Sequence, residues 1–170
     1  MTVKTFQGIK DVIDSATAGD TIKLTGTYIG SGAHIYVNKN LNFVGQNSAT
    51  LDAKSLSRII SITSSVKVTF TDITFKNGKT TGGSNMHGAA AYITSGSVNF
   101  TNCDFTDNTA NTAGGAIIIA NSGSANFTSC NFISNTATTN GGAVNSGSSS
   151  SSSFINCNFT GNLSLIHISE

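Results

Sequence analysis

Two carboxylates, Asp104 and Asp107, stand three residues apart in the segment Cys103-Asp104-Phe105-Thr106-Asp107. Converging carboxylate oxygens could bind Ca²⁺ or act as a general acid and base. The equivalent positions of the following repeat hold Asn131 and Ser134, so the carboxylates do not recur along the chain. We therefore expect solvated turn carboxylates at Asp104 and Asp107, with a metal site as the alternative.

The other ionisable residues do not form a recognisable reactive set. His34 and His87 have no Cys, Asp or Glu at metal-ligand spacing. Asp20 and Asp52 occupy segments in which an aspartate commonly hydrogen-bonds its own backbone in a turn. The one arginine, Arg58, has no acidic cluster around it in the sequence. We therefore predict no catalytic residue, no metal and no cofactor.

Three cysteines, Cys103, Cys130 and Cys157, recur at one constant interval. A zinc or redox site needs thiolates that converge, whereas a ladder of repeats points them in parallel. A disulfide needs Cβ atoms about 3.5–4.5 Å apart, slightly closer than neighbouring strands, and three is an odd number. We expect free, buried thiols.

The acceptor pattern for N-glycosylation occurs as Asn-Phe-Thr at Asn99, Asn126 and Asn158. Each asparagine precedes a phenylalanine, so it faces solvent if that phenylalanine faces a core. Asparagine is abundant in this chain, and such triplets therefore also arise by chance. These three residues are candidate glycosylation sites.

A repeat with a period of about 27 residues must position all of these side chains. Pairs of phenylalanines five residues apart carry it, and an asparagine follows each pair by three residues. Chance does not place several residue types in one register, which indicates a repeat architecture. The repeating residues are Phe100, Phe127 and Phe154; Phe105, Phe132 and Phe159; and Asn108, Asn135 and Asn162.

The segments inside each repeat are short and alternate between apolar and polar residues, as in 97–100 and 103–105, with Asn, Gly and Ser between them. This pattern is typical of strands, whereas helical repeats need runs of Ala, Leu, Glu and Lys that are missing here. Stacked coils about 4.8 Å apart would place Phe on Phe, Cys on Cys and Asn on Asn. The sequence therefore predicts an all-β parallel β-helix.

We divide the chain into three parts. Residues 1–34 hold a capping helix over 5–17, with Ile9, Val12, Ile13 and Ala16 on one face, followed by the first strand. Residues 35–162 form the coils. Residues 163–170 (LSLIHISE) resemble a translated sequencing adapter, so we expect a tail that is not native and a chain that is a fragment of a longer protein, with a real closing strand as the alternative.

The composition excludes several classes of partner. Ser, Thr and Asn supply 66 of the 170 residues, charged residues only 10%, and the formal net charge is +1. Such a chain has no basic field for nucleic acid and no polybasic face for anionic lipid. No apolar stretch approaches the ~20 residues of a membrane span. We expect neither nucleic-acid binding nor membrane insertion.

The motifs Gly-Gly-Ala-Ile at 114–117, Gly-Gly-Ala-Val at 141–144 and Phe-x-x-Asn at 105–108, 132–135 and 159–162 resemble those of chlamydial polymorphic outer-membrane proteins. Residues 13–22 and 37–41 extend a resemblance to adhesin-like surface proteins of methanogenic archaea. The resemblance covers about residues 5–162 and implies a right-handed, single-stranded parallel β-helix of pectin-lyase-like type on a cell surface. His87 departs from it, standing where the first glycine of a pair is expected.

Three functions follow as hypotheses. The first is a non-catalytic, extracellular adhesin-like module that contacts glycans or cell-surface proteins through weak multivalent interactions. The second is a polysaccharide lyase or hydrolase of the same fold, which would use clustered Asp with Arg or Lys. The third is ice binding, for which Thr71, Thr101 and Thr128 begin a flat row that Ile155 interrupts.

Overall fold

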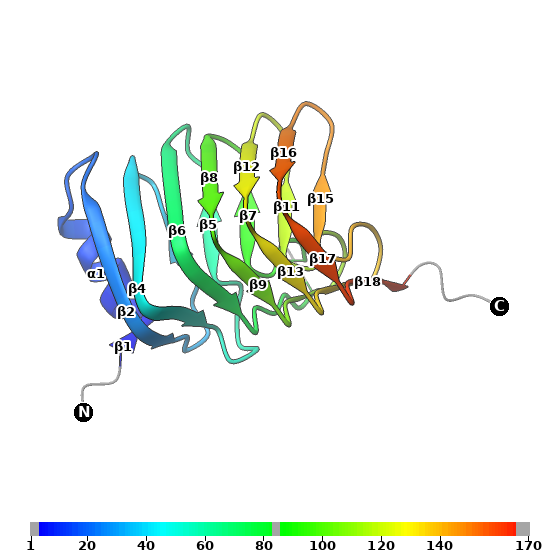
Figure 1. The fold of residues 1–170 in the computed structure, drawn as a ribbon, viewed down its shortest axis with the longest axis horizontal. Helices are drawn as coiled ribbons and strands as arrows, with labels where there is room; N and C mark the ends of the chain where they lie inside the picture. The colour runs from blue at the N-terminus through cyan, green and yellow to red at the C-terminus, as the bar shows by residue number, and fades with distance from the viewer. Residues whose placement is uncertain (1–3, 83–85, 166–170) are drawn as a thin grey trace.

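The computed structural model describes residues 4–82 and 86–165, which form an all-β parallel β-solenoid with one helix near the N-terminus (Figure 1). The predicted fold class is confirmed. The largest sheet, sheet A, takes strands from six successive coils of the described chain. Its strands are β1 (Lys4–Thr5), β2 (Thr21–Ile29), β4 (Leu41–Asp52), β6 (Lys67–Lys76), β8 (Ser97–Thr101), β9 (Asp104–Thr106), β12 (Ser124–Thr128), β13 (Asn131–Ile133), β16 (Ser151–Ile155) and β17 (Asn158–Thr160).

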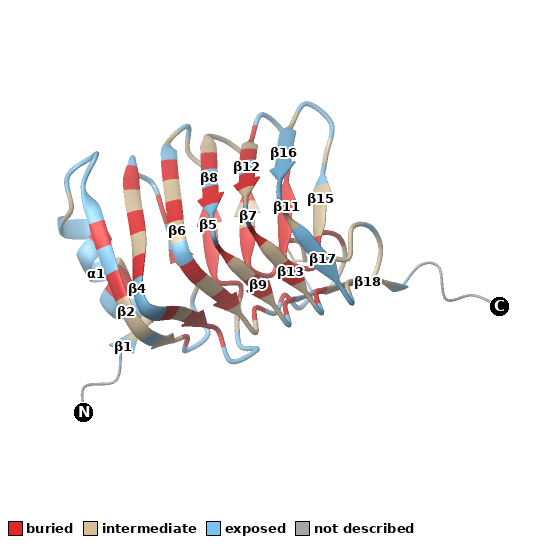
Figure 2. Ribbon diagram, in the orientation of Figure 1, coloured by how far each residue is buried: buried red, intermediate tan, exposed pale blue. Residues whose placement is uncertain are grey.

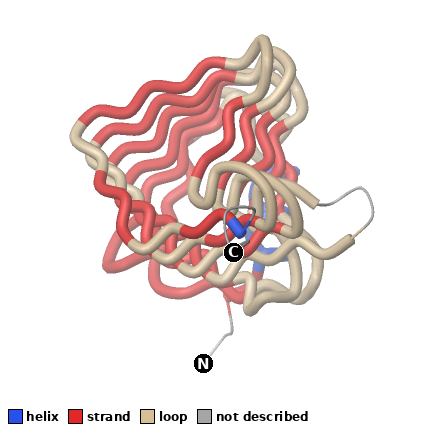
Figure 3. Tube along the Cα trace, turned by 90° about the vertical axis from the view of Figure 1, so that its right-hand side faces the viewer, coloured by secondary structure: helices blue, strands red, loops and turns tan. Residues whose placement is uncertain are grey.

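Two smaller sheets complete the coils, as the view along the solenoid shows (Figure 3). Sheet B contains β3 (Ile35–Tyr36), β5 (Ile60–Ile62), β7 (Ala91–Ile93), β11 (Ile117–Ile119) and β15 (Val144–Ser146). Sheet C contains β10 (Thr109–Ala110), β14 (Thr136–Ala137) and β18 (Leu163–Ser164). The strand pairs in all three sheets are parallel, so each coil hydrogen-bonds to the next along its perimeter.

Two columns of stacked phenylalanine rings fill the core. In the first column Phe100 lies 5.2 Å from Phe127, and Phe127 lies 4.9 Å from Phe154, between ring centroids. In the second column Phe105, Phe132 and Phe159 follow at 4.8 and 4.7 Å. The rings of the two columns meet edge to face, which is favourable because the positive edge of one ring contacts the negative face of the other. The period of the sequence repeat therefore corresponds to one coil.

A bend divides sheet A into two limbs, an upper limb that contains β8, β12 and β16 and a lower limb that contains β9, β13 and β17. Polar residues form this bend. Asn102, Ser129 and Asn156 stand between the limbs in successive coils, with φ of 51°, 54° and 53°. Small polar side chains tolerate this left-handed conformation because they hydrogen-bond locally and crowd the backbone little. Short strands that each bury a phenylalanine therefore alternate with an Asn or Ser in the left-handed conformation, and this alternation bends sheet A.

The Gly-Gly-Ala motif lies just before sheet B. Gly114 and Gly141 have φ of 67° and 63°, and Gly88 has the matching value of 57°. Ala91, Ile117 and Val144 are register partners, so Gly88 occupies the position of Gly114. The expectation that His87 stands in the first glycine's place is therefore wrong by one residue, because this coil is one residue shorter here.

Helix α1 (Phe6–Ser15) lies at the N-terminal end of the solenoid, as predicted (Figure 1). Its first turn is capped by Thr5, whose hydroxyl accepts the Gly8 amide at 3.2 Å. At its other end Lys39 donates to the carbonyls of Ile13, Asp14 and Ala16, each at 2.9 Å. A lysine of the next coil thus satisfies carbonyls that a helix C-terminus leaves unpaired.

The buried face of α1 differs from the predicted one. Phe6, Ile9 and Ile13 are buried, but Val12 is 46% exposed. Val12 instead lines a groove of about 440 Å³ between α1 and β2, together with Ile22. The helix packs through the stripe containing Phe6, which the sequence reading did not include.

The last coil is more exposed than the coils before it (Figure 2). Phe154 and Phe159 are 40% and 48% exposed, whereas Phe127 and Phe132 are fully buried, because no described coil covers the last one. In β18, Leu163 and Ser164 pair with β14 and continue sheet C. The remainder of the predicted tail, 166–170, lies outside the described residues.

Candidate functional site

The outer face of sheet A carries two lines of polar side chains that run along the solenoid. We define the first polar row as the solvent-facing positions in register on the upper limb of each coil. Because parallel strands stack like positions at one strand spacing, the row repeats about every 4.8 Å. Its members are Thr21, Asn42, Thr69, Asn99, Asn126 and Ser153.

Hydrogen bonds connect neighbouring members of the first polar row. Thr69 donates to the Asn42 side chain at 2.8 Å. Asn126 donates to Asn99 at 3.0 Å, and Ser153 donates to Asn126 at 2.9 Å. These bonds hold the amides and hydroxyls in fixed orientations on a regular lattice.

The second polar row runs along the other limb of sheet A. It contains Asp104, one of the two carboxylates identified in the sequence, and Asn131 donates to this carboxylate at 2.7 Å. Its members are Thr27, Thr50, Thr74, Asp104, Asn131 and Asn158. A long polymer lying along the wall would meet both rows at the same period.

A groove of about 250 Å³ lies where the limbs bend, and Asp72, Asn102 and Asp104 contribute to its lining. The sequence reading missed Asp72, which lies on the adjacent coil at a position that the repeat does not relate to Asp104. Asp107 is exposed in a turn with φ of 55°, as expected, whereas Asp104 is half-buried in strand β9, so the expectation of a turn carboxylate is wrong there. Within 4–82 and 86–165 no group of three or more His, Cys, Asp or Glu could hold a metal ion.

The three candidate glycosylation sites all face solvent. Asn99 and Asn126 belong to the first polar row and Asn158 to the second, and each is exposed. The adjoining phenylalanines point into the core as expected, although Phe159 is only partly covered. Glycosylation itself stays a prediction.

The cysteines form a ladder of free thiols. The thiols of Cys103, Cys130 and Cys157 donate to the carbonyls of Phe70, Phe100 and Phe127, each in the preceding coil, at 3.5 Å. Burial raises the pKa of the Cys103 thiol. Cys103 and Cys130 are fully buried, and Cys157 is partly exposed in the last coil.

A second ladder is built from buried amides. Asn108 and Asn135 are fully buried, and Asn162 follows them in the last coil. Asn108 donates to the Asn135 side-chain oxygen, and Asn135 donates to that of Asn162, both at 2.9 Å. Each asparagine also donates to the carbonyl of a phenylalanine in the preceding coil, as Asn135 does to Phe105 at 2.9 Å. The ladder joins consecutive coils in the interior.

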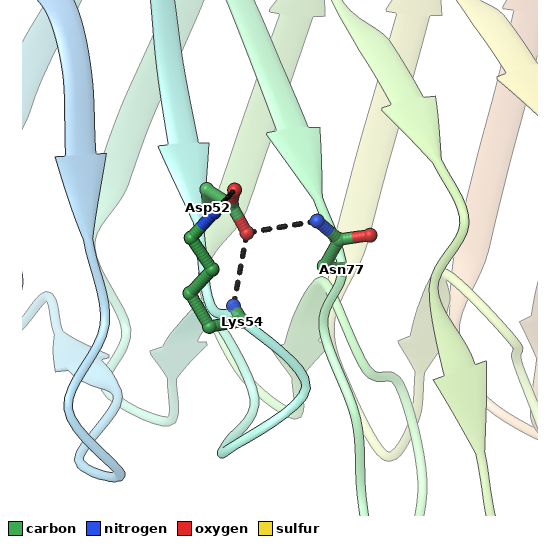
Figure 4. Close-up of polar contacts among 3 residues, drawn as sticks. All are labelled: Asp52, Lys54 and Asn77. Atoms are coloured by element: carbon green, nitrogen blue, oxygen red, sulfur yellow. Dashed lines mark hydrogen bonds and ion pairs between the residues drawn. The ribbon is translucent and has the colours of Figure 1, made fainter.

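Asp52 links two coils at the end of β4 (Figure 4). Its carboxylate accepts from the Lys54 amide and from the Asn77 side chain, both at 2.9 Å, and pairs with the Lys54 ammonium at 3.0 Å. Burial by itself would raise the pKa of this carboxyl. The hydrogen bonds and the Lys54 charge outweigh burial, so the pKa lies below its usual value.

We expect Asp52→Asn to lower the free energy of unfolding at pH 7 by about 1 kcal/mol, since it removes the ion pair with a half-exposed lysine. A carboxyl with a depressed folded-state pKa stabilises above its unfolded-state pKa of about 3.9 and loses this as pH falls through the folded value. The gap between wild type and variant should therefore close below about pH 4. Urea unfolding at pH 7, 4 and 3 measures the difference in free energy of unfolding between the two proteins. A difference that does not change with pH would contradict the stabilising role of the Asp52 carboxylate.

Of the remaining predicted residues, Asp20 and His87 lie in turns and loops, and the threonine row lies in strands. Asp20 accepts the Thr17 amide at 2.8 Å, the expected turn geometry. His87 is hydrogen-bonded through its ring to the Thr112 hydroxyl at 2.6 Å. The threonine row Thr71, Thr101 and Thr128 is in register and continues to Ile155, which interrupts it as the sequence indicated.

Sequence reasoning assigned no role to Arg58, which is 5% exposed and lies between β4 and β5. Its Nε and Nη2 donate to the carbonyls of Gly88 and His87 at 2.9 and 2.7 Å. A lone arginine gives no signal in the sequence, because these partners are backbone atoms of another coil.

None of the described helices could cross a membrane, for want of length and apolar character. Comparison of the chain with protein-family models, with curated proteins and with solved structures yields no match.

Proposed function

We propose that this β-solenoid is a non-catalytic module of a cell-surface protein that binds glycans on the outer face of sheet A. The observation that carries the proposal is the pair of polar rows, six residues each, held at the spacing of the coils. Sugar hydroxyls both donate and accept, as do amides and hydroxyls of the protein. Many weak contacts on one polymer combine into a useful avidity.

The adhesin-like resemblance of the repeats supports placement outside the cell, where such contacts would serve attachment. The polar wall is also compatible with partner proteins that carry glycans. Attachment sites at Asn99, Asn126 or Asn158, if modified, would occupy the same face and limit access to it.

A glycan-array screen with the purified protein tests this function. A double variant, Asn99→Ala with Asn126→Ala, should weaken binding of any glycan retained by the wild type about tenfold or more, because neighbouring contacts act together. Asn145→Ala on sheet B is the matched control and should bind normally. Equal binding by the double variant would place the contact elsewhere and contradict the proposal.

A polysaccharide lyase or hydrolase is the second candidate, and the groove shared by Asp72 and Asp104 is the observation that favours it. Uronate-containing polymers can be incubated with the protein, with and without Ca²⁺, and assayed for cleavage. Turnover that Asp104→Ala abolishes would establish the enzyme and displace the adhesin proposal.

A further inference from the structure

A small pocket of about 190 Å³ lies on the loops that lead from sheet A to sheet B. Three successive coils contribute to it: His34 precedes β3, Arg58 precedes β5, and Lys79 follows β6. Backbone hydrogen bonds bring these loops together, since the Lys79 amide donates to the Ser57 carbonyl at 2.9 Å. The site is therefore assembled by coil stacking and is separate from the polar rows.

Arg58 supplies a fixed positive charge at this pocket. Its hydrogen bonds to the carbonyls of His87 and Gly88 hold the guanidinium, whose central carbon lies 4.6 Å from the centre of the Tyr92 ring. Burial lowers the pKa of this group to about 10, so it remains protonated at neutral pH. The two carbonyls and the Tyr92 ring are neutral groups, and they hold the cation in a fixed orientation.

Among the other lining residues, Lys79 adds to the positive potential. Lys79 is exposed at the rim, and none of the described residues that line the pocket is acidic. Burial first, and then the charges of Arg58 and Lys10, lower the pKa of His34. Hydroxyl groups of Thr80 and Thr81 complete a lining suited to the oxygens of an anion, whereas the Ser57 hydroxyl already donates to the Arg58 carbonyl at 2.8 Å.

We propose that this pocket binds a single carboxylate or sulfate group of an acidic polysaccharide. The proposal rests on the glycan-binding function above and adds the class of glycan. The volume is below the ~300–1,000 Å³ of sites that enclose whole small molecules, so the pocket fits one charged substituent while the rest of the polymer stays outside.

The test compares polygalacturonate, dextran sulfate and neutral dextran by isothermal titration calorimetry at low salt. Lys79→Gln should weaken binding of at least one acidic polymer about tenfold, the effect of losing one charge-assisted hydrogen bond. Lys67→Gln is the control, because it removes the same charge from an exposed lysine at the start of β6. The two acidic polymers distinguish carboxylate from sulfate recognition.

The outcomes separate the pocket from the glycan function. If the wild type binds neutral and acidic polymers equally and Lys79→Gln matches it, the pocket proposal is wrong while glycan binding stands. The same is true if Lys67→Gln weakens binding as much as Lys79→Gln, since the effect is then one of net charge.

If no polymer binds, inorganic sulfate tests the pocket alone. An NMR titration follows the pKa of His34, which burial and then the charges of Arg58 and Lys10 lower. A bound anion should raise the pKa of His34, and Lys79→Gln should weaken sulfate binding several-fold. An unchanged His34 titration in sulfate would overturn the proposal.

Discussion

Replacing Asn135 by alanine is expected to lower the free energy of unfolding by about 3 kcal/mol or more, because each buried polar group left without a partner costs about 1–3 kcal/mol. Its side chain makes four buried or partly buried hydrogen bonds, accepting from the amide and side chain of Asn108 and donating to Phe105 and Asn162. The change leaves groups without partners in the two coils that flank Asn135.

Urea unfolding followed by circular dichroism measures this effect, with Asn126→Ala as the control. Asn126 lies in the same coil and also bonds to an asparagine one coil away, but it is exposed. Water replaces its lost partners, so the control should change stability by only about 0.5 kcal/mol. Similar losses in the two variants would show that burial of the ladder contributes little.

Gly115→Ala is the second change with a large expected effect. A Cβ atom at this position would lie 1.9 Å from the carbonyl oxygen of Gly142 and 2.7 Å from the backbone of Thr136. Both are backbone atoms of the next coil, so relief requires the coils to move apart. We expect a loss of about 3 kcal/mol or more, at or beyond the upper end for overpacked cores.

Gly82→Ala is the matched control, because no atom of the described residues lies within 4 Å of a Cβ atom there. The melting temperature of this control should stay near that of the wild type, whereas Gly115→Ala should melt well below it or fail to fold. A Gly115→Ala protein of normal melting temperature would mean that the coils at this edge adjust without cost.

Sequence periodicity predicted the regular half of the solenoid well. Phe100, Phe127 and Phe154 are register partners across coils of constant length, as are Asn131 and Asn158. The asparagine corners, the stacked aromatic columns and the free thiols follow from that spacing alone. The sequence also located the helix. It did not predict that Lys39, from another coil, donates to the carbonyls at the C-terminus of the helix.

The irregular half needed the structure. Ile22 pairs with Phe43, Phe43 with Phe70, and Phe70 with Phe100, so the early coils differ in length from one another. A sequence repeat predicts which residues are neighbours only where successive coils have the same length. A change in coil length shifts the loops of one coil relative to those of the next. Asp72 and Asp104 therefore met in one groove without any sign in the sequence.

The order of residues by itself determined that this chain coils into stacked parallel strands with like side chains above one another. Only the tertiary structure decided that His34, Arg58 and Lys79 share one pocket and that Gly88, not His87, takes the glycine position. The physical reason is that backbone hydrogen bonds between coils set the register of the loops. Because the loops differ in length, this register cannot be read from the spacing of residues in the sequence.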